Sequence, residues 1–242
     1  MSTPPGDFTH ALPAGLAASL AQRYTLLGLL GEGGFGQVCH ARQLATGQEV
    51  AIKVLRLRRH AGAVAPAKQI TRFRRELDLC ARLYHPHIVR PLDCGEGEAD
   101  LIYTVFGLIP GRNLAETLAA EGSLSPTDAI RLLGQVLDAL HCAHRAGVIH
   151  RDLKPENIMI SHTGALPSAQ VLDFGIGVLS EESDGAGRLT EPHESLGSPA
   201  YAAPEQLRGE AVSVSTDIYA WGLVFLECLQ GSPAMAGGGL SE

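Results

Sequence analysis

The 242-residue sequence lacks the cysteine spacing of a zinc-binding or disulfide-stabilised protein. Structural zinc sites and small disulfide frameworks depend on closely spaced or paired cysteines. The five cysteines here are scattered and include no Cys-x-x-Cys pair: Cys39, Cys80, Cys94, Cys142 and Cys228. Their pattern argues against both kinds of protein and favours a reducing compartment, so we expect a cytoplasmic location.

The sequence also lacks a surplus of positive charge and a long hydrophobic run. Its formal net charge of −7 gives no general attraction to nucleic acid or to anionic membranes. No stretch reaches the roughly 18 consecutive apolar residues of a membrane helix, and residues 1–10 lack the basic start of a secretory signal. We therefore expect no nucleic-acid partner and no membrane segment in this chain. Hydrophobic residues make up 45% and charged residues 19%, which is typical of a globular protein.

The first half of the chain has the pattern of a small sheet with one helix. Residues 1–22, rich in proline and alanine, are expected to form a flexible leader. Strand-like blocks broken by glycine turns follow over 24–30, 37–42, 49–55, 88–94 and 101–106. A helix is predicted over 66–83, where Ile70, Phe73, Leu77 and Cys80 recur at three- and four-residue spacing. The expected result is an antiparallel sheet carrying a single helix.

Beyond a hinge predicted near residues 107–112, the sequence becomes helical. Helices are predicted over 113–120, 125–145 and 216–229, and short buried strands over 148–149, 158–160 and 171–172. Ser125 is a good N-cap for the longest helix, and Pro126 suits its first position. The apolar face of that helix is predicted to consist of Ile130, Leu133, Val136, Leu137 and Leu140. Residues 180–198 lack periodicity, and we expect a long loop there.

The segment from His150 to Asn157 concentrates polar side chains between two apolar runs. Asp152 is suited to accept a proton from a hydroxyl group. The amide oxygen of Asn157 is a suitable ligand for a hard cation such as Mg²⁺, and Lys154 can neutralise a phosphoryl group. A polar surface turn with an Asp–Lys pair is the alternative interpretation of this segment alone.

A glycine-rich run, Gly31 to Val38, has the form G-x-G-x-x-G-x-V. Glycines let backbone N–H groups approach a phosphate closely because no Cβ intervenes. A dinucleotide-binding fingerprint shares this spacing but requires a helix next, whereas a strand pattern follows here. The nucleotide-phosphate interpretation is therefore favoured over the dinucleotide one.

Lys53 lies inside the apolar strand Val50-Ala51-Ile52-Lys53. A buried ammonium group requires an anionic partner, and Glu76 in the predicted helix is a candidate. The alternatives are a lysine that reaches solvent from an edge strand and a glutamate on the helix surface.

Two further tripeptides complete the set of motifs. Asp173-Phe174-Gly175 follows an apolar run, so its carboxylate is predicted at a strand end, where it suits a metal ligand. Ala203-Pro204-Glu205 closes the long loop. Each tripeptide is unremarkable by itself.

The order of these motifs along the chain is decisive. From residue 24 to about residue 231 the chain resembles the eukaryotic-type protein kinases. The segment from Asp152 to Asn157 resembles that of the serine/threonine-specific branch. The chain is most similar to the bacterial members of the family. The resemblance implies an α+β fold with two lobes. The small lobe, about 23–107, would be an antiparallel sheet with one main helix, and the large lobe, about 113–242, would be mainly helical.

The resemblance further implies an ATP-dependent transfer of the γ-phosphoryl group to serine or threonine hydroxyls of proteins, with Mg²⁺. Asp152 would accept the proton, assisted by Lys154, Lys53 and Asn157, while Asn157 and Asp173 would hold the metal. The implied nucleotide-binding residues are Leu30, Gly31, Glu32, Gly33, Gly34, Phe35, Gly36, Val38, Ala51, Lys53, Glu76, Phe106, Leu108, Met159 and Asp173. Phe106 falls at the position that limits the back of the adenine site.

Regulation is also implied by the resemblance. An arginine at position 151 can pair with a phosphate group on the segment between Asp173 and Glu205. We expect autophosphorylation there, with Thr190 and Ser195 preferred over Ser180 and Ser183. Ser198 stands where the family has a threonine that contacts Asp152 and Lys154.

One departure from the family pattern concerns the large lobe. Kinases of this type continue with several helices after the one predicted over 216–229, and here only residues 232–242 follow. We therefore expect a C-terminally incomplete large lobe, no arginine partner for Glu205, and an exposed apolar face over 217–223 unless further helices or a partner protein cover it. A truncated, weakly active or inactive kinase fold that acts as a scaffold or ATP-binding module is the alternative function. A small-molecule phosphotransferase is a third interpretation, and the Ala203-Pro204-Glu205 segment argues against it.

Overall fold

The structure is a computed structural model that describes residues 20–33, 36–56, 66–97, 101–174 and 199–233. The chain divides into two compact units. The first unit contains residues 1–75 and 90–108, and the second contains residues 76–89 and 109–242. Each unit is a body with its own core, and the lobe boundaries given above stay predictions.

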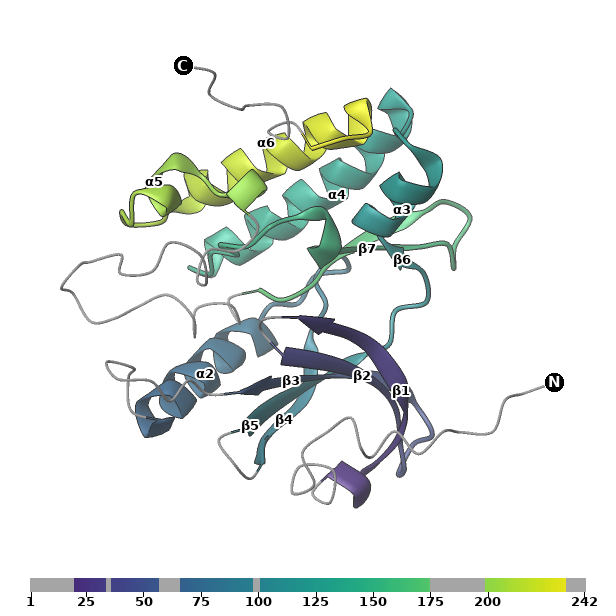
Figure 1. Cartoon of the computed structure of the whole chain (residues 1–242), viewed down its shortest axis with the longest axis vertical. Coiled ribbons are helices and arrows are strands. Elements are labelled where there is room, and N and C mark those ends of the chain that lie inside the picture. Colours follow the sequence, from purple (N-terminus) through teal and green to yellow (C-terminus); the bar gives the residue numbers. More distant parts are fainter. Residues whose placement is uncertain (1–19, 34–35, 57–65, 98–100, 175–198, 234–242) are drawn as a thin grey trace. The chain divides into compact units, whose positions relative to one another are not determined.

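The first unit is built on a five-stranded sheet with strand order β1-β2-β3-β5-β4 (Figure 1). All four strand pairs are antiparallel. The strands are β1 (Tyr24–Gly33), β2 (Gly36–Gln43), β3 (Glu49–Arg56), β4 (Pro91–Gly97) and β5 (Leu101–Gly107). The predicted small antiparallel sheet is confirmed.

The fourth strand begins at Pro91 and not at residue 88, so that part of the prediction was wrong. The backbone N–H of Val89 donates to the carbonyl of Val171, and Ile88 forms an isolated bridge with the same residue. The side chain of Ile88 is buried in the core of the second unit. Ile88 is therefore apolar because it packs in the core of the second unit, whereas β4 belongs to the sheet of the first unit.

Alternating side chains of the sheet form the core of the first unit, among them Cys39, Val50, Ile52 and Val105. Leu20, which precedes β1, is also fully buried in this core. The first position of β2 requires glycine, Gly36. Its φ is +134°, and a Cβ there would lie 1.9 Å from the carbonyl oxygen of Val54.

Helix α2 (Pro66–Ala81) has the predicted three- and four-residue spacing of buried side chains. Phe73, Leu77 and Cys80 are buried, and the helix ends two residues before the predicted position. The division between the two units falls between Arg75 and Glu76.

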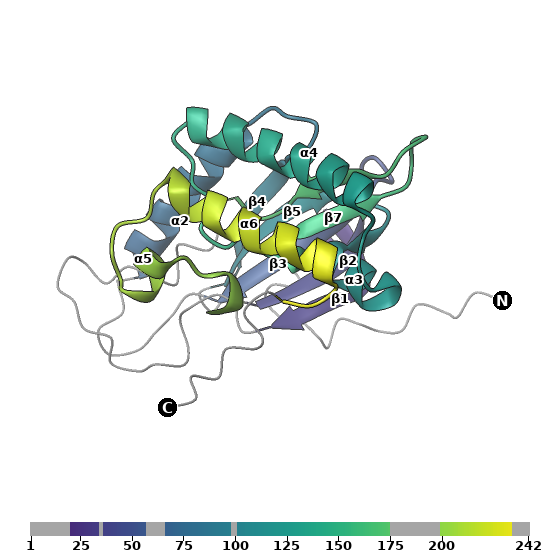
Figure 2. The same cartoon turned by 90° about the horizontal axis from the view of Figure 1, so that it is seen from above.

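The second unit combines helices with a small sheet of order β6-β7-β8, antiparallel throughout. Its strands are β6 (Arg112–Asn113), β7 (Ile158–Ser161) and β8 (Ser168–Val171). Its helices are α3 (Leu114–Glu121), α4 (Pro126–Arg145), α5 (Pro204–Leu207) and α6 (Val214–Gln230), with 3₁₀ turns η2 (Pro155–Asn157) and η4 (Pro199–Tyr201). Helices α4 and α6 run side by side (Figure 2).

The start of α4 confirms the predicted cap. Ser125 is the N-cap, its hydroxyl oxygen accepts a hydrogen bond from the backbone N–H of Asp128 at 3.1 Å, and Pro126 follows at the first position. This bond satisfies one of the N–H groups that have no partner within the helix.

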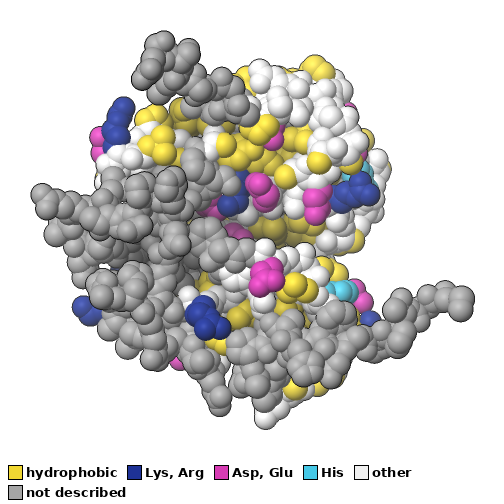
Figure 3. Space-filling view, in the orientation of Figure 1, with side chains coloured by type: hydrophobic (Ala, Val, Ile, Leu, Met, Phe, Trp, Pro, Cys, Tyr) yellow, Lys and Arg dark blue, Asp and Glu magenta, His cyan; other side chains and the backbone are white. Residues whose placement is uncertain are grey.

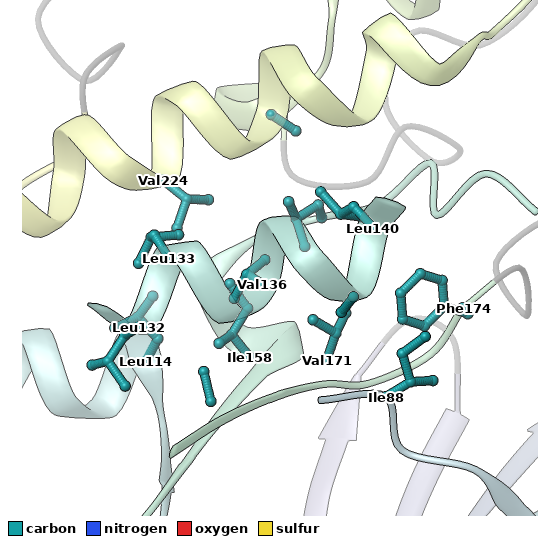
Figure 4. Packing of buried hydrophobic residues seen from close by; sticks show 14 of the residues in the cluster. Ile88, Leu114, Leu132, Leu133, Val136, Leu140, Ile158, Val171, Phe174 and Val224 are labelled. Carbon is teal, nitrogen blue, oxygen red and sulfur yellow. The ribbon is translucent and has the colours of Figure 1, made fainter. Parts of the chain in front are cut away.

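The predicted apolar face of α4 was partly wrong. Leu133, Val136 and Leu140 are buried, whereas Ile130 is 63% exposed and Leu137 is 37% exposed. Figure 4 shows the buried stripe of α4, with Leu133 next to Val224 of α6. Leu132 and the small side chains of Ala129, Ala139 and Ala143 complete this stripe. The prediction missed all four, although Leu132 is as apolar as the residues it named.

The run Val148-Ile149 is not a strand, which corrects another prediction. The backbone N–H of Val148 donates to the carbonyl of Ala143 at 2.9 Å, so it completes the end of α4 and does not pair with a strand. Val148 is nevertheless buried. The predicted strand over 158–160 is confirmed as β7, and the last helix begins at Val214 with Ser213 as N-cap.

Helix α6 exposes apolar side chains. Within the expected range 217–223, Ile218 and Tyr219 are exposed, whereas Ala220 is buried. Ile218, Tyr219, Leu226 and Leu229 are each at least a third exposed, and hydrophobic side chains are visible along this face of the second unit (Figure 3). Within the ranges that the structure describes, none of the helices has the length and apolar content to cross a bilayer.

Candidate functional site

The loop from His150 to Asn157 is held by a buried carboxylate of helix α6. Asp217 is 1% exposed, and its two oxygens accept the backbone N–H groups of His150 and Arg151, each at 2.8 Å. The Oδ2 atom of Asp217 also lies 2.7 Å from Nε2 of His144 on α4. A buried carboxylate with three donors is well compensated, so it fixes the start of the loop.

Arg151 has a left-handed backbone, with φ at +69°. This conformation is strained for a residue with a Cβ and persists only where surrounding contacts enforce it. Besides the bond to Asp217, the carbonyl of Arg151 accepts a hydrogen bond from Nε2 of Gln206 at 2.7 Å. Its Nε atom is buried and has no hydrogen-bond partner in the described part of the chain.

Three side chains of the loop converge on one another. The ammonium group of Lys154 lies 2.9 Å from Oδ2 of Asp152. The amide nitrogen of Asn157 donates to the backbone carbonyl of Asp152 at 2.7 Å and to the same Oδ2 atom at 3.2 Å. Because the nitrogen faces Asp152, the Oδ1 oxygen of Asn157 points away from that carboxylate.

Asp173 follows β8 and also has a left-handed backbone, with φ at +60°. The preceding residue, Leu172, donates its N–H to the carbonyl of Asn157 at 2.9 Å and accepts from Nε2 of His150 at 2.8 Å. The following residue, Phe174, is buried and meets the His150 ring edge-on at 4.9 Å. Asp173 is therefore placed beside the loop that carries Asp152 and Asn157.

His150 connects the loop that carries Asp152 to the residue before Asp173 through both of its ring nitrogens. Its Nε2 donates to Leu172, and its Nδ1 accepts the backbone N–H of Asp152 at 3.3 Å. These two contacts select the tautomer with the proton on Nε2.

The segment from Tyr201 to Glu205, which contains the Ala203-Pro204-Glu205 motif, is attached to helix α6 by two polar pairs. The hydroxyl of Thr216 donates to Glu205 at 2.6 Å, and this bond lowers the pKa of the Glu205 carboxyl. The hydroxyl of Tyr201 donates to Glu227 at 2.5 Å. Burial raises the pKa of the Glu227 carboxyl, and the bond from Tyr201 acts in the opposite direction.

The nucleotide-binding residues predicted in the first unit lie on adjacent strands. Leu30, Gly31, Glu32 and Gly33 end β1, and Gly36 starts β2. Val38 stands opposite both Gly31 and Lys53 in the sheet register.

The remaining predicted residues of that unit lie on β3 and β5. Ala51 stands opposite Phe106, and Lys53 opposite Thr104. Lys53 is half-buried, and Phe106 is buried. The backbone N–H of Leu108 donates to the carbonyl of Glu49 at 3.2 Å.

Several predicted residues lie outside what the structure describes. These are Gly34, Phe35, Ser198, the side chain of Glu76, and the candidate phosphorylation sites Ser180, Ser183, Thr190 and Ser195. The predicted Lys53–Glu76 pair and the contact of Ser198 with Asp152 therefore stay predictions. Met159, in β7 of the second unit, is half-buried.

Comparison with known proteins decides the family. The family model described as "Protein kinase domain" matches residues 24–240, which is most of the chain. The chain belongs to the protein kinase family. It is 38% identical over 214 residues to the serine/threonine-protein kinase pkn3 of Myxococcus xanthus, covering 88% of this chain and 38% of that protein. It is equally identical over 221 residues to the serine/threonine-protein kinase PknB of Mycobacterium tuberculosis, covering 90% of this chain and 34% of that protein.

A probable PknB of Corynebacterium glutamicum gives the same identity over 221 residues, with 90% of this chain and 33% of the relative covered. The chain thus spans about a third of the length of the curated relatives it matches. The resemblance to bacterial serine/threonine kinases and the kinase fold class are confirmed by these matches together with the observed elements.

The kinase motifs did not identify all the residues that support the loop. Four residues that the sequence did not single out support this part of the structure. Asp217, His144 and Gln206 hold the loop from His150 to Asn157, and Glu227 holds Tyr201. An acid in the first turn of a helix is expected from the helix dipole alone, so Asp217 gave no distinct signal. For Glu227, the available sign was a carboxylate directly after the apolar run Leu223-Val224-Phe225-Leu226 and before Cys228-Leu229.

Within the described residues there is no cluster of three or more histidine, cysteine or acidic side chains that could hold a metal ion. Mg²⁺ commonly binds through one or two protein oxygens together with substrate phosphates. Asp173 and Asn157 supply a carboxylate and an amide oxygen, so the residues present fit a phosphate-bound Mg²⁺ better than a resident all-protein metal site.

Proposed function

We propose that this kinase chain transfers the γ-phosphoryl group of Mg-ATP to serine or threonine hydroxyls of proteins. The observation that carries the proposal is the arrangement of Asp152, with Lys154 at 2.9 Å and Asn157 at 3.2 Å from the same carboxylate oxygen. An acid held in one orientation beside a cation and a metal-ligating amide is what phosphoryl transfer to a hydroxyl requires.

Each group of the second unit has a defined part in this reaction. Asp152 orients the substrate hydroxyl and accepts its proton as the oxygen bonds to phosphorus. The bond between the γ-phosphorus and the bridging oxygen breaks, and ADP leaves. Lys154 neutralises the phosphoryl oxygens, and Asn157 and Asp173 hold Mg²⁺, which supplies charge neutralisation for the phosphates.

The first unit supplies the nucleotide-binding residues under the same proposal. The backbone of Gly31, Gly33 and Gly36 covers the phosphates, and Lys53 contacts the α- and β-phosphates. Two observations support this: Gly36 tolerates no side chain, and Lys53 lies on an inner strand of the sheet. Val38, Ala51 and Leu108, all of the first unit, belong to the adenine site under this proposal.

The decisive test is incorporation of radiolabelled phosphate from Mg-ATP into a generic protein substrate. Asp152→Ala is expected to reduce incorporation at least 100-fold, the order of a lost general base. Asp138→Ala, which changes an exposed acid on α4, is the matched control and retains activity. Equal incorporation by the wild type and Asp152→Ala would refute the proposal.

We also propose regulation by autophosphorylation between residues 174 and 205. Arg151 supports it, because a buried guanidinium nitrogen without a partner among the described residues is suited to bind an anion. Phosphopeptide mapping of active protein tests this, with Thr190 and Ser195 expected first. Unmodified peptides from fully active protein would contradict it.

A scaffold or ATP-binding function without transfer is the second candidate. The exposed apolar side chains of α6 favour it, because such a face suits contact with a partner protein or with further helices. The two candidates separate cleanly in one pair of measurements: a scaffold binds ATP in calorimetry yet incorporates no phosphate. We place either activity in the cytoplasm, where ATP is available and the five free cysteines remain reduced.

A further inference from the structure

Gln206 is a half-buried side chain of helix α5 that binds two separate stretches of backbone. Its Oε1 atom accepts the N–H of Ala203 at 3.1 Å, and its Nε2 atom donates to the carbonyl of Arg151 at 2.7 Å. Ala203 belongs to the motif Ala203-Pro204-Glu205, whereas Arg151 directly precedes Asp152. One amide group therefore links these two motifs, although Arg151 and Gln206 are 55 residues apart in sequence.

The bond from Gln206 to Arg151 acts on the peptide group that orients Asp152. This peptide group consists of the carbonyl of Arg151 and the N–H of Asp152. The N–H contacts Nδ1 of His150 at 3.3 Å, so the 2.7 Å bond from Gln206 is the shorter of its two contacts. Because Arg151 has a left-handed φ of +69°, it keeps this conformation only where contacts on both sides enforce it.

The turn that carries Gln206 is also held by contacts that do not involve its side chain. Glu205 accepts the hydroxyl of Thr216 at 2.6 Å, and the backbone N–H of Glu210 donates to the Glu205 carbonyl at 2.8 Å. Removal of the Gln206 donor should therefore leave the turn attached to helix α6 while it frees the carbonyl of Arg151.

We propose that Gln206 is a positioning residue that couples the segment around Ala203 to the carboxylate of Asp152. Its amide holds the Arg151 peptide and thereby fixes the direction in which the Asp152 side chain leaves the backbone. A glutamine amide suits this part because one planar group offers both an acceptor and two donors. The inference rests on the proposed function, since it gives Asp152 the part of the proton acceptor.

Two substitutions test the donor. Gln206→Glu keeps an acceptor for Ala203 and nearly the same shape but offers no donor when ionised, and Gln206→Met offers neither group at a similar length. The first readout is steady-state phosphate transfer from Mg-ATP to a protein substrate. We expect both variants to lower kcat by roughly three- to tenfold, the effect of one ordinary hydrogen bond, and to leave the KM for ATP unchanged.

Gln170→Met is the matched control. The amide of Gln170 also donates to a backbone carbonyl, that of Pro86, at 3.3 Å. Since this carbonyl lies outside the loop that carries Asp152, the control keeps the wild-type kcat.

The second readout separates an action through Asp152 from a general loss of structure. Gln206→Met is combined with Asp152→Ala, and the residual transfer is compared with that of Asp152→Ala alone. If Gln206 acts through Asp152, its substitution has no further effect once the carboxylate is absent. A further loss in the double variant, as large as that of Gln206→Met in the wild type, overturns the inference.

The third readout does not depend on catalysis. Amide hydrogen exchange followed by mass spectrometry measures the opening of residues 148–157, on protein shown by circular dichroism to be folded. We expect exchange there to be faster in both variants, by a factor similar to the change in kcat, and unchanged in helix α4. Gln206→Glu supplies the kinetic and exchange measurements by itself should Gln206→Met not fold.

A wild-type kcat in Gln206→Glu overturns the inference, and so does a change confined to the KM for the protein substrate. Wild-type exchange over residues 148–157 in the variants overturns it as well. Wild-type protein that transfers no phosphate refutes the proposed function instead, and the exchange measurement then still decides whether Gln206 holds the loop.

Discussion

Asp217 holds the backbone of Arg151 across 66 residues of sequence, with its Oδ1 atom 2.8 Å from the arginine N–H. The bond fixes a left-handed residue immediately before Asp152, so the direction of the proposed catalytic carboxylate is determined from helix α6. Since the other oxygen of Asp217 accepts from His150 and contacts His144, one buried side chain joins helix α4, the loop and helix α6.

Asp217→Ala is expected to lower the free energy of unfolding by about 3 kcal/mol, because it leaves buried N–H groups without an acceptor. Urea denaturation followed by circular dichroism measures the change. Asp138→Ala removes an exposed acid that contacts His85 at 3.1 Å and should change stability by no more than about 0.5 kcal/mol. Comparable losses in the two variants would show that the Asp217 contacts add little.

Lys154→Met should abolish most activity without unfolding the protein. It removes the cation 2.9 Å from Asp152 and keeps a side chain of similar length. We expect kcat to fall about 100-fold, typical of losing one preorganised electrostatic contact, with a smaller change in the KM for ATP. Lys68→Met, on the exposed side of α2, is the control. A change in KM alone would assign Lys154 to binding and not to transfer.

Two glycine-to-alanine changes in the second unit should have opposite effects on stability. Gly111 has φ +147°, and a Cβ there would lie 2.0 Å from the carbonyl oxygen of Ile160. Gly111→Ala is therefore expected to destabilise the protein by about 3 kcal/mol or more.

Gly134, within helix α4, has no heavy atom within 4 Å of the added Cβ. Gly134→Ala should stabilise the protein by about 0.5–1 kcal/mol, because glycine is a poor helix former. Thermal unfolding of both variants measures the pair. Two shifts of the same sign would contradict the local geometry described for one of the two positions.

Tyr201→Phe should produce a loss of stability that grows with pH. Burial raises the pKa of the Glu227 carboxyl above its usual value, and the hydrogen bond from Tyr201 opposes that rise. A carboxyl with a raised pKa favours the fold below its unfolded pKa, and this contribution is lost as the pH rises through the folded pKa. Removing the Tyr201 hydroxyl raises that pKa further. The variant therefore loses more folding stability than the wild type as the pH rises towards neutral.

We expect a difference of about 1–3 kcal/mol at pH 7, the cost of a buried acceptor without its donor, and little difference near pH 4. Urea denaturation across this range measures it. Tyr219→Phe is the control. Tyr219 lies on the exposed side of helix α6, which also carries Glu227, and the effect of this change on stability should be independent of pH. A difference that stays constant with pH would mean that Glu227 does not respond to Tyr201.

The sequence predicted the sheet of the first unit well because its information is local. A strand such as β3 alternates side chains between two faces, and Gly36 at the start of β2 tolerates no side chain. Helix α4 was predicted for the same reason, from Ser125 and Pro126 at its start. Its buried face was partly missed, since which side of a helix is covered depends on neighbours such as Val224 of α6.

The motifs themselves were also determined by sequence alone. Asp152, Lys154 and Asn157 lie within a few residues of one another, so their convergence depends mainly on one loop. Their order relative to the glycine-rich run and Asp173 was enough to indicate a kinase, because each motif is short and its identity does not depend on packing.

The tertiary structure alone decided what holds these motifs in place. Asp217 and Cys80 lie 66 and 94 residues from the backbone groups they bind. No periodic pattern or turn signal links residues so far apart. The hydrogen-bonding capacity of a buried carboxylate or thiol becomes specific only when packing excludes water and brings one donor or acceptor within reach.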